Sequence, residues 1–509
     1  MARNQLKAGV VLSYLAQTIN IFITLFYTPV MLRLLGQSEF GIYQIVYSVV
    51  GFLALLNFGF SSSYIKFYTI AKNKDSSGLE VAKLNASFVV VFSLLSLIVL
   101  ILGCLMAYNT DSVLGGKLTE DELGTAKVLM YILVINTVVQ FEYVVFNNFL
   151  IANEKFIALQ IITIISTILN PCFTFPMLLL GYGSIGMGVA LLSISVLQLL
   201  FASIYCIRKL KIRFVFRGLV WGAFKDIGVF SFYIFLESVI SLINISLDRF
   251  LLGKLVGSIS AAIYAVGGQI NSLYTYLSTT ISSVFIPRVN RLVEDGDKNK
   301  ELSDLFIRVG KIQFVVLYLI LCGFIIFGQR FMKLWVGEGY DEAFVVALIL
   351  IIPNTINLIQ NVAYEIQRAK FLQKYRSLMW IFIAILNIIV SIFFIKKWGA
   401  SGAALGTAIA WIVGSGFLMN WFYAKYVALD IKSFWAEILR LMRGGIIPLA
   451  IGAISYKLLL HCSVIVFFGS MFIFAVVYAI SMYYTAFNLI EKEMVKQYIS
   501  QALQKVRLR

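Results

Sequence analysis

The chain has 509 residues, of which 60% are hydrophobic and 13% charged, and its mean hydropathy is +0.90. Soluble domains contain about 45–50% apolar and about 25% charged residues, so this composition excludes a chain with a fully water-exposed surface. The net charge of +17 would suggest nucleic acid in a soluble protein, but here we expect no nucleic-acid partner. The five cysteines and one histidine lack metal-ligand spacing, so we expect no metal, no bound cofactor and no catalytic residues.

Long uninterrupted apolar stretches predict membrane-spanning helices, because about 20 apolar residues are needed to cross a bilayer. These stretches do not alternate polar and apolar residues, which argues against a barrel. The candidate spans, in chain order, are 8–32, 40–63, 86–108, 127–149, 157–180, 184–206, 227–247, 259–286, 307–328, 343–364, 377–395, 400–424, 444–460 and 464–488. The sequence therefore predicts an all-α integral membrane protein with about 14 transmembrane helices.

Lysine and arginine are distributed unevenly among the loops between these spans. With the N-terminus in the cytoplasm, 32 of the 42 basic residues fall in cytoplasmic segments. Positive charge is enriched on that side of membrane proteins, so the sequence predicts a multi-pass protein with both termini in the cytoplasm. Contacts with membrane lipids that carry negative charge are a second expected effect. The longest external loop, Asn109–Ala126, is too short to form a separate domain.

The two halves of the chain resemble each other at a nearly constant offset. Arg33-Leu-Leu-Gly36 matches Arg249-Phe-Leu-Leu-Gly253, and Gly183-Ser-Ile-Gly186 matches Gly399-Ala-Ser-Gly402, so that 249 − 33 and 399 − 183 both give 216. Each repeat holds six spans and both insert with the same orientation, which predicts two pseudo-symmetric six-helix lobes plus two C-terminal helices. The expected domains are 1–215 (spans one to six), 216–430 (spans seven to twelve) and 431–509 (spans thirteen and fourteen with the tail). Rocking of two such lobes opens the seam between them to each side of the membrane in turn.

Two carboxylates lie deep in apolar segments, Glu142 in the fourth span and Glu237 in the seventh. An ionisable group inside a bilayer costs about 2.5–3.5 kcal/mol on insertion scales, so each carboxylate calls for a reason. They could couple transport to a proton or sodium gradient, or they could stabilise helix packing. Asp248 could belong to the same coupling group, or it could neutralise the neighbouring Arg249.

Basic residues at the ends of spans form a second candidate group. Arg33 and Arg249 are repeat mates near the external face, Lys66 and Arg288 are mates at cytoplasmic ends, and Arg291 follows Arg288 by one turn. Because a guanidinium fork matches phosphate bidentately, these residues are candidates for holding a pyrophosphate in the seam. The alternative is that they snorkel to the membrane interface, as basic residues at helix ends commonly do.

Uncharged polar residues are concentrated in the first and eighth spans. The candidates for a sugar-binding cavity are Tyr14, Gln17, Asn20, Gln269, Asn271 and Tyr274. Amides and aromatic rings suit sugar hydroxyls, which favours a wet cavity along these helices. The alternative is hydrogen bonding between helices.

Four short motifs carry a resemblance to a known family. They are Leu35-Gly36-x4-Gly41-Ile-Tyr43, Leu56-Asn57-Phe58-Gly59, Asp248-Arg249-Phe-Leu-Leu-Gly253 and Ala262-Ile-Tyr264. Together with the two six-helix lobes, these motifs resemble the polysaccharide transporter family. Its members are the O-antigen, capsule and wall-polymer flippases of the multidrug/oligosaccharidyl-lipid/polysaccharide superfamily.

The resemblance implies a flippase of the bacterial plasma (inner) membrane, not an enzyme. Its substrate would be a polyprenyl-pyrophosphate-linked oligosaccharide, moved by alternating access from the cytoplasmic to the outer leaflet. Lys66, Arg249 and Arg288 would contact the pyrophosphate, spans one and eight the sugars, and spans thirteen and fourteen the lipid tail. A polymerase of the same export pathway is an implied partner. One departure matters, because the apolar run of span one carries no arginine as the related peptidoglycan-precursor flippases do.

Two alternatives stay open at this point. Glu142 and Glu237 also suit a cation-coupled multidrug or small-molecule exporter. A membrane enzyme such as a polymerase or ligase would be expected to use a substantial external loop, and the loop Asn109–Ala126 gives it little support.

Overall fold

The computed structural model describes residues 2–58, 60–74, 77–219, 235–236, 238–240, 242–296, 298–461, 463–489, 491–493 and 496–497. Within these residues, all regular secondary structure is helical, as the sequence predicts. The chain divides into two compact units. Unit 1 is Met1–Ala265 with Ala384–Ala403, and unit 2 is Val266–Ile383 with Ala404–Arg509. The boundaries expected at residues 215 and 430 stay a prediction.

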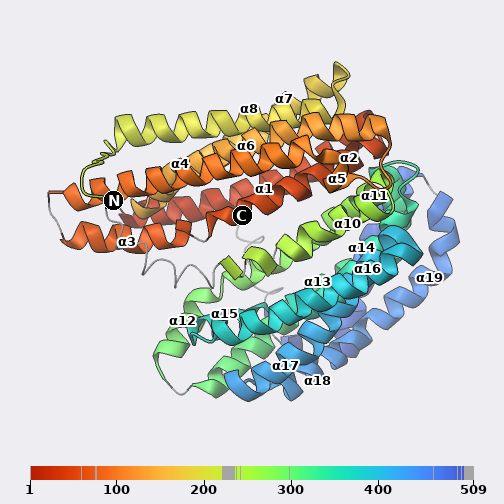
Figure 1. Cartoon of the computed structure of the whole chain (residues 1–509). Coiled ribbons are helices and arrows are strands. Elements are labelled where there is room, and N and C mark those ends of the chain that lie inside the picture. The colour runs from red at the N-terminus through yellow and green to blue at the C-terminus, as the bar shows by residue number, and fades with distance from the viewer. Residues whose placement is uncertain are drawn as a thin grey trace, which may run out of the picture. The chain divides into compact units, whose positions relative to one another are not determined.

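Unit 1 contains the long helices of the first half of the chain. Its elements are α1 (Ala2–Leu35), α2 (Gln37–Gly51), η1 (Phe52–Asn57), α3 (Phe60–Lys74), α4 (Leu79–Tyr108), α5 (Thr110–Leu114), α6 (Glu120–Ala152), α7 (Phe156–Leu179), α8 (Gly183–Ile204), η2 (Tyr205–Lys209), η3 (Ile243–Leu247) and α10 (Asp248–Leu255). Helix α6 packs against α2, α4 and α8, and α1 packs against α7 (Figure 1). Helix α6 is therefore the central helix of this unit.

Unit 2 is arranged around one long helix, α13 (Asn299–Trp335). The elements that belong to it wholly or in part are α11 (Ser258–Ser283), α12 (Ile286–Glu294), α14 (Asp341–Leu358), α15 (Asn361–Ala369), α16 (Gln373–Trp411), η4 (Ile412–Leu418), α17 (Met419–Phe422), η5 (Tyr423–Val427), α18 (Ile431–Met442), η6 (Arg443–Gly445), α19 (Ile446–His461), α20 (Val464–Ser481) and η7 (Met482–Ala486). Helix α13 packs against α14, α18, α19 and α20 (Figure 1). The division between the units falls inside α11 and α16.

Eleven helical segments among the described residues are long and apolar enough to cross a membrane. These eleven segments differ from the 14 expected spans in three ways. Span 227–247 falls largely outside the described residues, α11 is present but lies outside this apolar set, and spans 377–395 and 400–424 are counted as one segment, Lys374–Val427. In that segment the backbone leaves helical geometry at Trp398 and Gly399. The all-α integral membrane fold is confirmed, and the helix count stays a prediction.

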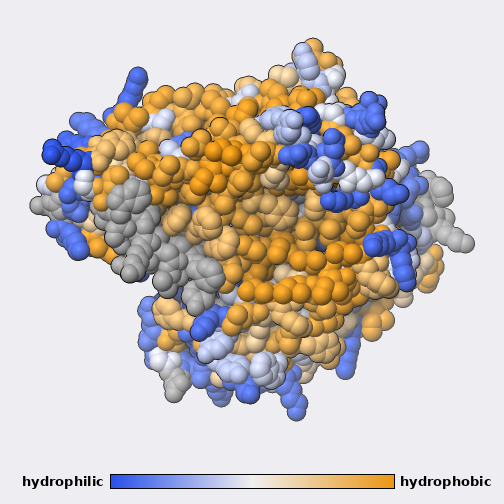
Figure 2. All heavy atoms as spheres, viewed as in Figure 1, coloured by the Kyte–Doolittle hydropathy of each residue, from blue (hydrophilic) through white to orange (hydrophobic). Residues whose placement is uncertain are grey.

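The flanks of the helices are apolar. Along α4, side chains exposed between 42% and 54% are Leu94, Leu97, Ile98, Ile101, Leu102 and Leu105. In a water-soluble protein such a continuous exposed stripe would be unstable, whereas in a bilayer it faces lipid at no cost. Figure 2 shows the same pattern over each unit, with hydrophobic residues along the helices and hydrophilic residues gathered near their ends.

The internal repeat is visible in backbone conformation. Five non-glycine residues among those described have positive φ, which is uncommon outside glycine. Four of them form two pairs: Glu154 and Phe371 (φ 56° and 59°), and Lys211 and Ala428 (φ 53° and 61°), for which 371 − 154 and 428 − 211 both give 217. The mates Gly183 and Gly399 also match, with φ of 54° and 53°. The two halves therefore make the same turns at equivalent positions.

The segment Asn109–Ala126, expected to be an external loop, is mostly helical. It contains α5, and α6 already begins at Glu120, seven residues before the expected start of the span at residue 127. The Thr119 hydroxyl accepts from the Glu122 backbone N–H, and the Glu122 carboxylate accepts from the Thr119 N–H. This capping box stabilises a helix start in a polar segment, where hydropathy alone indicates a loop.

An ion-pair network joins α13 and α18 to the last described residues of unit 2. Lys311 Nζ lies 3.0 Å from Glu437 Oε2 and 2.5 Å from Glu491 Oε1, and Arg440 Nη2 lies 3.0 Å from Glu491 Oε2. Burial acts to raise the pKa of Glu491, but hydrogen bonds from Lys311 and from the Asn488 N–H outweigh it and lower that pKa below its usual 4.5. Glu491 is therefore ionised when the network forms.

Replacing Glu491 with glutamine is expected to destabilise unit 2 by about 1–2 kcal/mol, because hydrogen bonds to a charged group are lost at a partly exposed site. The folded pKa is lower than the unfolded one, so this stability is present above the unfolded pKa and is lost as pH falls through the folded pKa. Thermal unfolding of the E491Q variant should therefore depend less on pH below about pH 5 than that of the parent. The control is Glu493→Gln at an exposed position two residues on, and an E491Q melting temperature equal to that of E493Q would contradict the role of the network.

Candidate functional site

A polar cavity of about 330 Å³ lies inside unit 1. Its walls come from α2, η1, α6 and η3 together with Leu242. The polar residues that line it are Tyr47, Asn57, Asn136, Thr137, Gln140 and Ser246. Amide and hydroxyl groups both donate and accept hydrogen bonds, so a wall of this kind suits a ligand rich in hydroxyl groups.

The polar face of α6 is held in place by α8. The Ser195 hydroxyl donates to Asn136 Oδ1 over 2.6 Å, and Gln140 Nε2 donates to Ser195 Oγ over 2.7 Å and to Gln198 Oε1 over 3.2 Å. Ser195 is 1% exposed, so the hydroxyl that joins the two amides is buried. The two amides are therefore positioned before any ligand binds, which lowers the entropy cost of binding.

Arg249 lies beside one end of the cavity. It follows the lining residue Ser246 by one turn, and its Nη1 donates to Gln44 Oε1 over 3.1 Å. Gln44 in turn precedes the lining residue Tyr47 by one turn of α2. The Arg249 Nε–H is buried and has no acceptor among the described residues. A guanidinium with an unused donor is suited to bind an oxyanion.

Asp248 is only 1% exposed and accepts a hydrogen bond of 2.7 Å from the Tyr264 hydroxyl. It thus places a carboxylate next to Arg249 inside unit 1. Both residues come from the Asp248–Gly253 motif, and Tyr264 ends the Ala262-Ile-Tyr264 motif. The structure therefore brings together two of the motifs quoted for the family resemblance.

The other candidates in unit 1 lie elsewhere. Arg33 and Lys66 are exposed on α1 and α3, and Glu142, half-buried on α6, accepts from Ser93 Oγ over 3.4 Å. None of the three lines the polar cavity. The α1 residues expected to contact sugar are also outside its wall, and they are half-buried (Gln17) or exposed (Tyr14 and Asn20). Glu237 lies outside the described residues.

The basic candidates of unit 2 lie on the short helix α12. Arg288 and Arg291 are exposed, whereas Val289 and Leu292 are buried on the other side. The helix is therefore amphipathic, with both arginines on its polar face. Their expected role in binding pyrophosphate stays a prediction.

The polar residues of α11 are engaged with α14. Asn354 Nδ2 donates to Asn271 Oδ1 over 2.9 Å, and the hydroxyls of Tyr274 and Thr355 are 2.8 Å apart. Tyr274 is 2% exposed. These contacts are the interhelical hydrogen bonds that stood as the alternative to a sugar cavity. Gln269 differs, because its buried Oε1 has no donor among the described residues.

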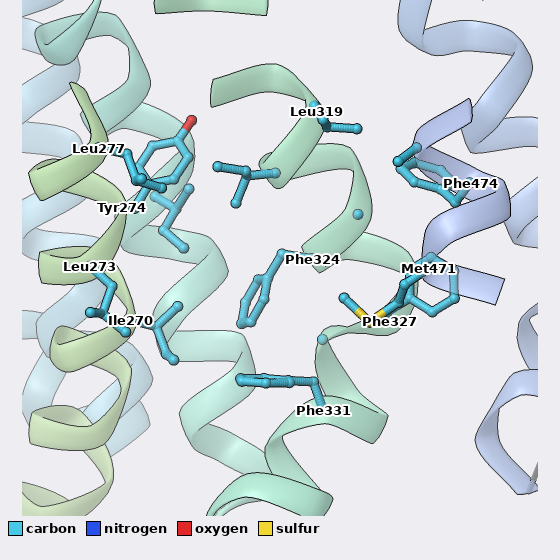
Figure 3. A pocket seen from close by; sticks show the side chains of 15 residues that line it. Ile270, Leu273, Tyr274, Leu277, Leu319, Phe324, Phe327, Phe331, Met471 and Phe474 are labelled. Atoms are coloured by element: carbon cyan, nitrogen blue, oxygen red, sulfur yellow. The ribbon is translucent and has the colours of Figure 1, made fainter. Parts of the chain in front are cut away.

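An apolar pocket of about 320 Å³ is present in unit 2. Figure 3 shows its wall, which α11, α13, α14 and α20 contribute. The aromatic rings of Phe324, Phe327 and Phe331 come from α13, and Met471 and Phe474 come from α20. Such a wall suits a hydrocarbon chain.

Residues 30–345 match the family model described as polysaccharide biosynthesis protein. The chain belongs to this family. The family resemblance carried by the sequence motifs is therefore confirmed. The match covers the polar cavity, the buried Asp248, the half-buried Arg249 and the motifs around them, so this site lies within the residues that match the family.

Proteins of similar sequence or structure support this family assignment. A Shigella flexneri protein named "Putative O-antigen transporter" is 22% identical over an alignment of 403 residues, and the match covers 77% of this chain and 91% of that protein. The structure of the lipid II flippase MurJ in an inward closed conformation matches with a TM-score of 0.75 at 20% identity, covering 93% of this chain and 97% of that one. An inward-facing multidrug resistance MATE family transporter matches with a TM-score of 0.66 at 16% identity, covering 82% and 98%.

Most residues that line the polar cavity were not predicted as site residues from the sequence. Asn136 and Gln140 stand four residues apart in an apolar span, so they share one helix face. This spacing in the sequence indicates a polar face on that helix. Asn57 belongs to the Leu56-Asn57-Phe58-Gly59 motif, but nothing in that motif indicates a cavity. Ser246 and Gln44 carried no such signal, because only the packing of η3 against α2 gives them their position.

Proposed function

We propose that this protein is a flippase for a lipid-linked oligosaccharide. The substrate would be a polyprenyl-pyrophosphate that carries a sugar repeat unit. The protein would move this substrate from the cytoplasmic to the outer leaflet of a bacterial inner membrane by alternating access, with both termini in the cytoplasm. The protein is multi-pass and belongs to a polysaccharide family. A transporter role, without chemistry on the substrate, is consistent with the names of its relatives.

The observation that carries the proposal is the pair of unlike cavities in one membrane chain. A polar cavity beside the half-buried Arg249 suits sugar hydroxyls and an oxyanion. An apolar pocket of similar volume, lined by phenylalanines of α13 and α20, suits an isoprenoid tail. A substrate with a charged polar head and a long hydrocarbon tail uses both kinds of surface. The involvement of α20, the expected fourteenth span, supports the expected tail contact.

The test is transfer of a labelled polyprenyl-pyrophosphate oligosaccharide in proteoliposomes, read out by an impermeant enzyme that removes sugar only from the outer leaflet. We expect a rate well above that of protein-free vesicles. Equal rates with and without the protein would overturn the proposal. Applying a proton or a sodium gradient in the same vesicles tests the expected coupling, for which Glu142 and Asp248 are the described candidates.

A multidrug exporter shares this fold, as the MATE structure shows. The same vesicles distinguish the two functions, because an exporter would accumulate a cationic dye and leave the glycolipid in place. A polymerase of the same pathway is the protein partner that this function implies, since flipped repeat units are the substrate of polymerisation.

A further inference from the structure

A second polar cavity, of about 200 Å³, lies inside unit 2. It is formed where α14 ends and α15 begins, against the start of α16 and against η4, α17 and η5. Its wall contains the amides of Asn357, Gln360 and Asn361, the rings of Tyr364, Trp380 and Tyr423, and the guanidinium of Arg376. None of these residues was among the sequence candidates.

Arg376 is held by aromatic rings. Its guanidinium carbon lies 3.9 Å from the centroid of the Tyr364 ring and 5.6 Å from that of Trp380. A guanidinium this close to two aromatic rings is attracted by their π faces, which restricts its position. The cavity thus contains a positive charge held against its wall.

Two further donors in the wall lack acceptors. The Trp380 Nε1–H and the Gln360 Nε2–H are buried and have no hydrogen-bond partner among the described residues, and Gln360 is 3% exposed. An indole N–H can only donate. Buried donors without acceptors are uncommon in native structures and call for an explanation such as an absent ligand.

The neighbouring amides each already use one group in a hydrogen bond. Asn357 Oδ1 accepts from the Ser415 hydroxyl over 3.4 Å, and Asn361 Nδ2 donates to Ser278 Oγ over 3.2 Å. The buried groups of this wall that have no partner among the described residues are the N–H donors of Trp380 and Gln360. A ligand that satisfies them must bring oxygen acceptors, and the nearby Arg376 guanidinium favours one that carries negative charge.

We propose that this cavity binds a phosphate group, with Arg376, Trp380 and Gln360 as its donors. The site does not depend on the transport function proposed above, because it rests on residues of unit 2 alone. A phosphate could reach it as a free ion or as the headgroup of a membrane phospholipid, and Arg376 ends a segment that the charge bias of the loops assigns to the cytoplasmic side.

The test uses the full chain in nanodiscs with 15N-labelled tryptophan indoles, and the Trp380 signal is assigned by its loss in a Trp380→Phe variant. One arm adds inorganic phosphate to discs of phosphatidylcholine. The other compares phosphatidylcholine discs with discs containing phosphatidylglycerol, without free phosphate. We expect the Trp380 indole signal to shift in at least one arm. A shift in the first arm identifies the free ion, and a shift in the second identifies the lipid headgroup.

Variants distinguish binding in this cavity from unspecific attraction of an anion to positive charge. Binding, followed by the Trp380 indole signal, should weaken at least tenfold in Arg376→Gln. Lys374→Gln removes one positive charge from an exposed position two residues away, and its binding should stay within twofold of the parent. Equal weakening in K374Q and R376Q, or no indole shift in either arm, would overturn the proposal and leave the cavity filled by water only.

Discussion

Transport of the lipid-linked oligosaccharide is expected to fall about 10- to 100-fold when Arg249 is replaced by alanine, because a hydrogen bond to a charged group is worth about 1.5–3 kcal/mol. The variant loses the guanidinium beside the polar cavity, its bond to Gln44 and the buried Nε–H that is available for an oxyanion. Initial flipping rates in proteoliposomes measure the effect.

Two companion variants show whether Arg249 acts on the substrate or only on folding. Arg249→Lys keeps the charge and loses the fork, so it should insert and melt like the parent but transport more slowly. Lys254→Ala removes a positive charge from the same helix, away from the cavity wall, and should transport at the parental rate. If R249K flips substrate as fast as the parent, the guanidinium fork has no role in transport.

A Gly41→Ala variant is expected to be less stable by about 1–3 kcal/mol or more, since overpacking at a rigid contact costs this much. A Cβ at Gly41 would lie 2.0 Å from the carbonyl oxygen of Ser258, and neither α2 nor the start of α11 can yield there without a backbone shift. The Gly41-Ile-Tyr43 motif thus owes its glycine to a close helix approach. The melting temperature in detergent measures the loss.

Gly124→Ala is the matched control. Its Cβ would have no atom within 4 Å, and alanine is favoured over glycine inside a helix by about 1 kcal/mol. This variant should therefore melt at or above the parental temperature. A G41A variant as stable as G124A would show that the two helices do not approach as closely as described.

The fold was largely readable from the sequence, because apolar runs of fixed length leave few alternatives in a membrane. Hydropathy alone did not predict what the polar residues of a helix do when they contact another helix or cap the helix start. Helix α11 was expected at 259–286 and is present, but its Asn271 and Tyr274 serve contacts with α14 rather than an open cavity wall. The start of α6 at Glu120 was missed because a capping box, not hydrophobicity, sets it.

The candidate site was only partly readable. Arg249 and Asp248 stood out because charge near an apolar span is rare. Exposed charges such as Arg33 and Lys66 give the same signal in sequence, and only burial distinguishes them. Arg376 and Trp380 were not singled out, since their cavity partners Gln360 and Tyr423 are on other helices, and no spacing along one helix links them.

The matching left-handed residues 217 positions apart are the expected trace of gene duplication. With the six spans that the sequence predicts for each copy, an ancestor of half the length would have inserted in one orientation and paired with itself, so that every group on its surface occurred twice. Fusion of two such copies would remove that constraint. At the positions equivalent to Arg376 and Trp380, 376 − 217 and 380 − 217, the first copy has Leu159 and Thr163. The two copies have kept the same turns while their interiors diverged.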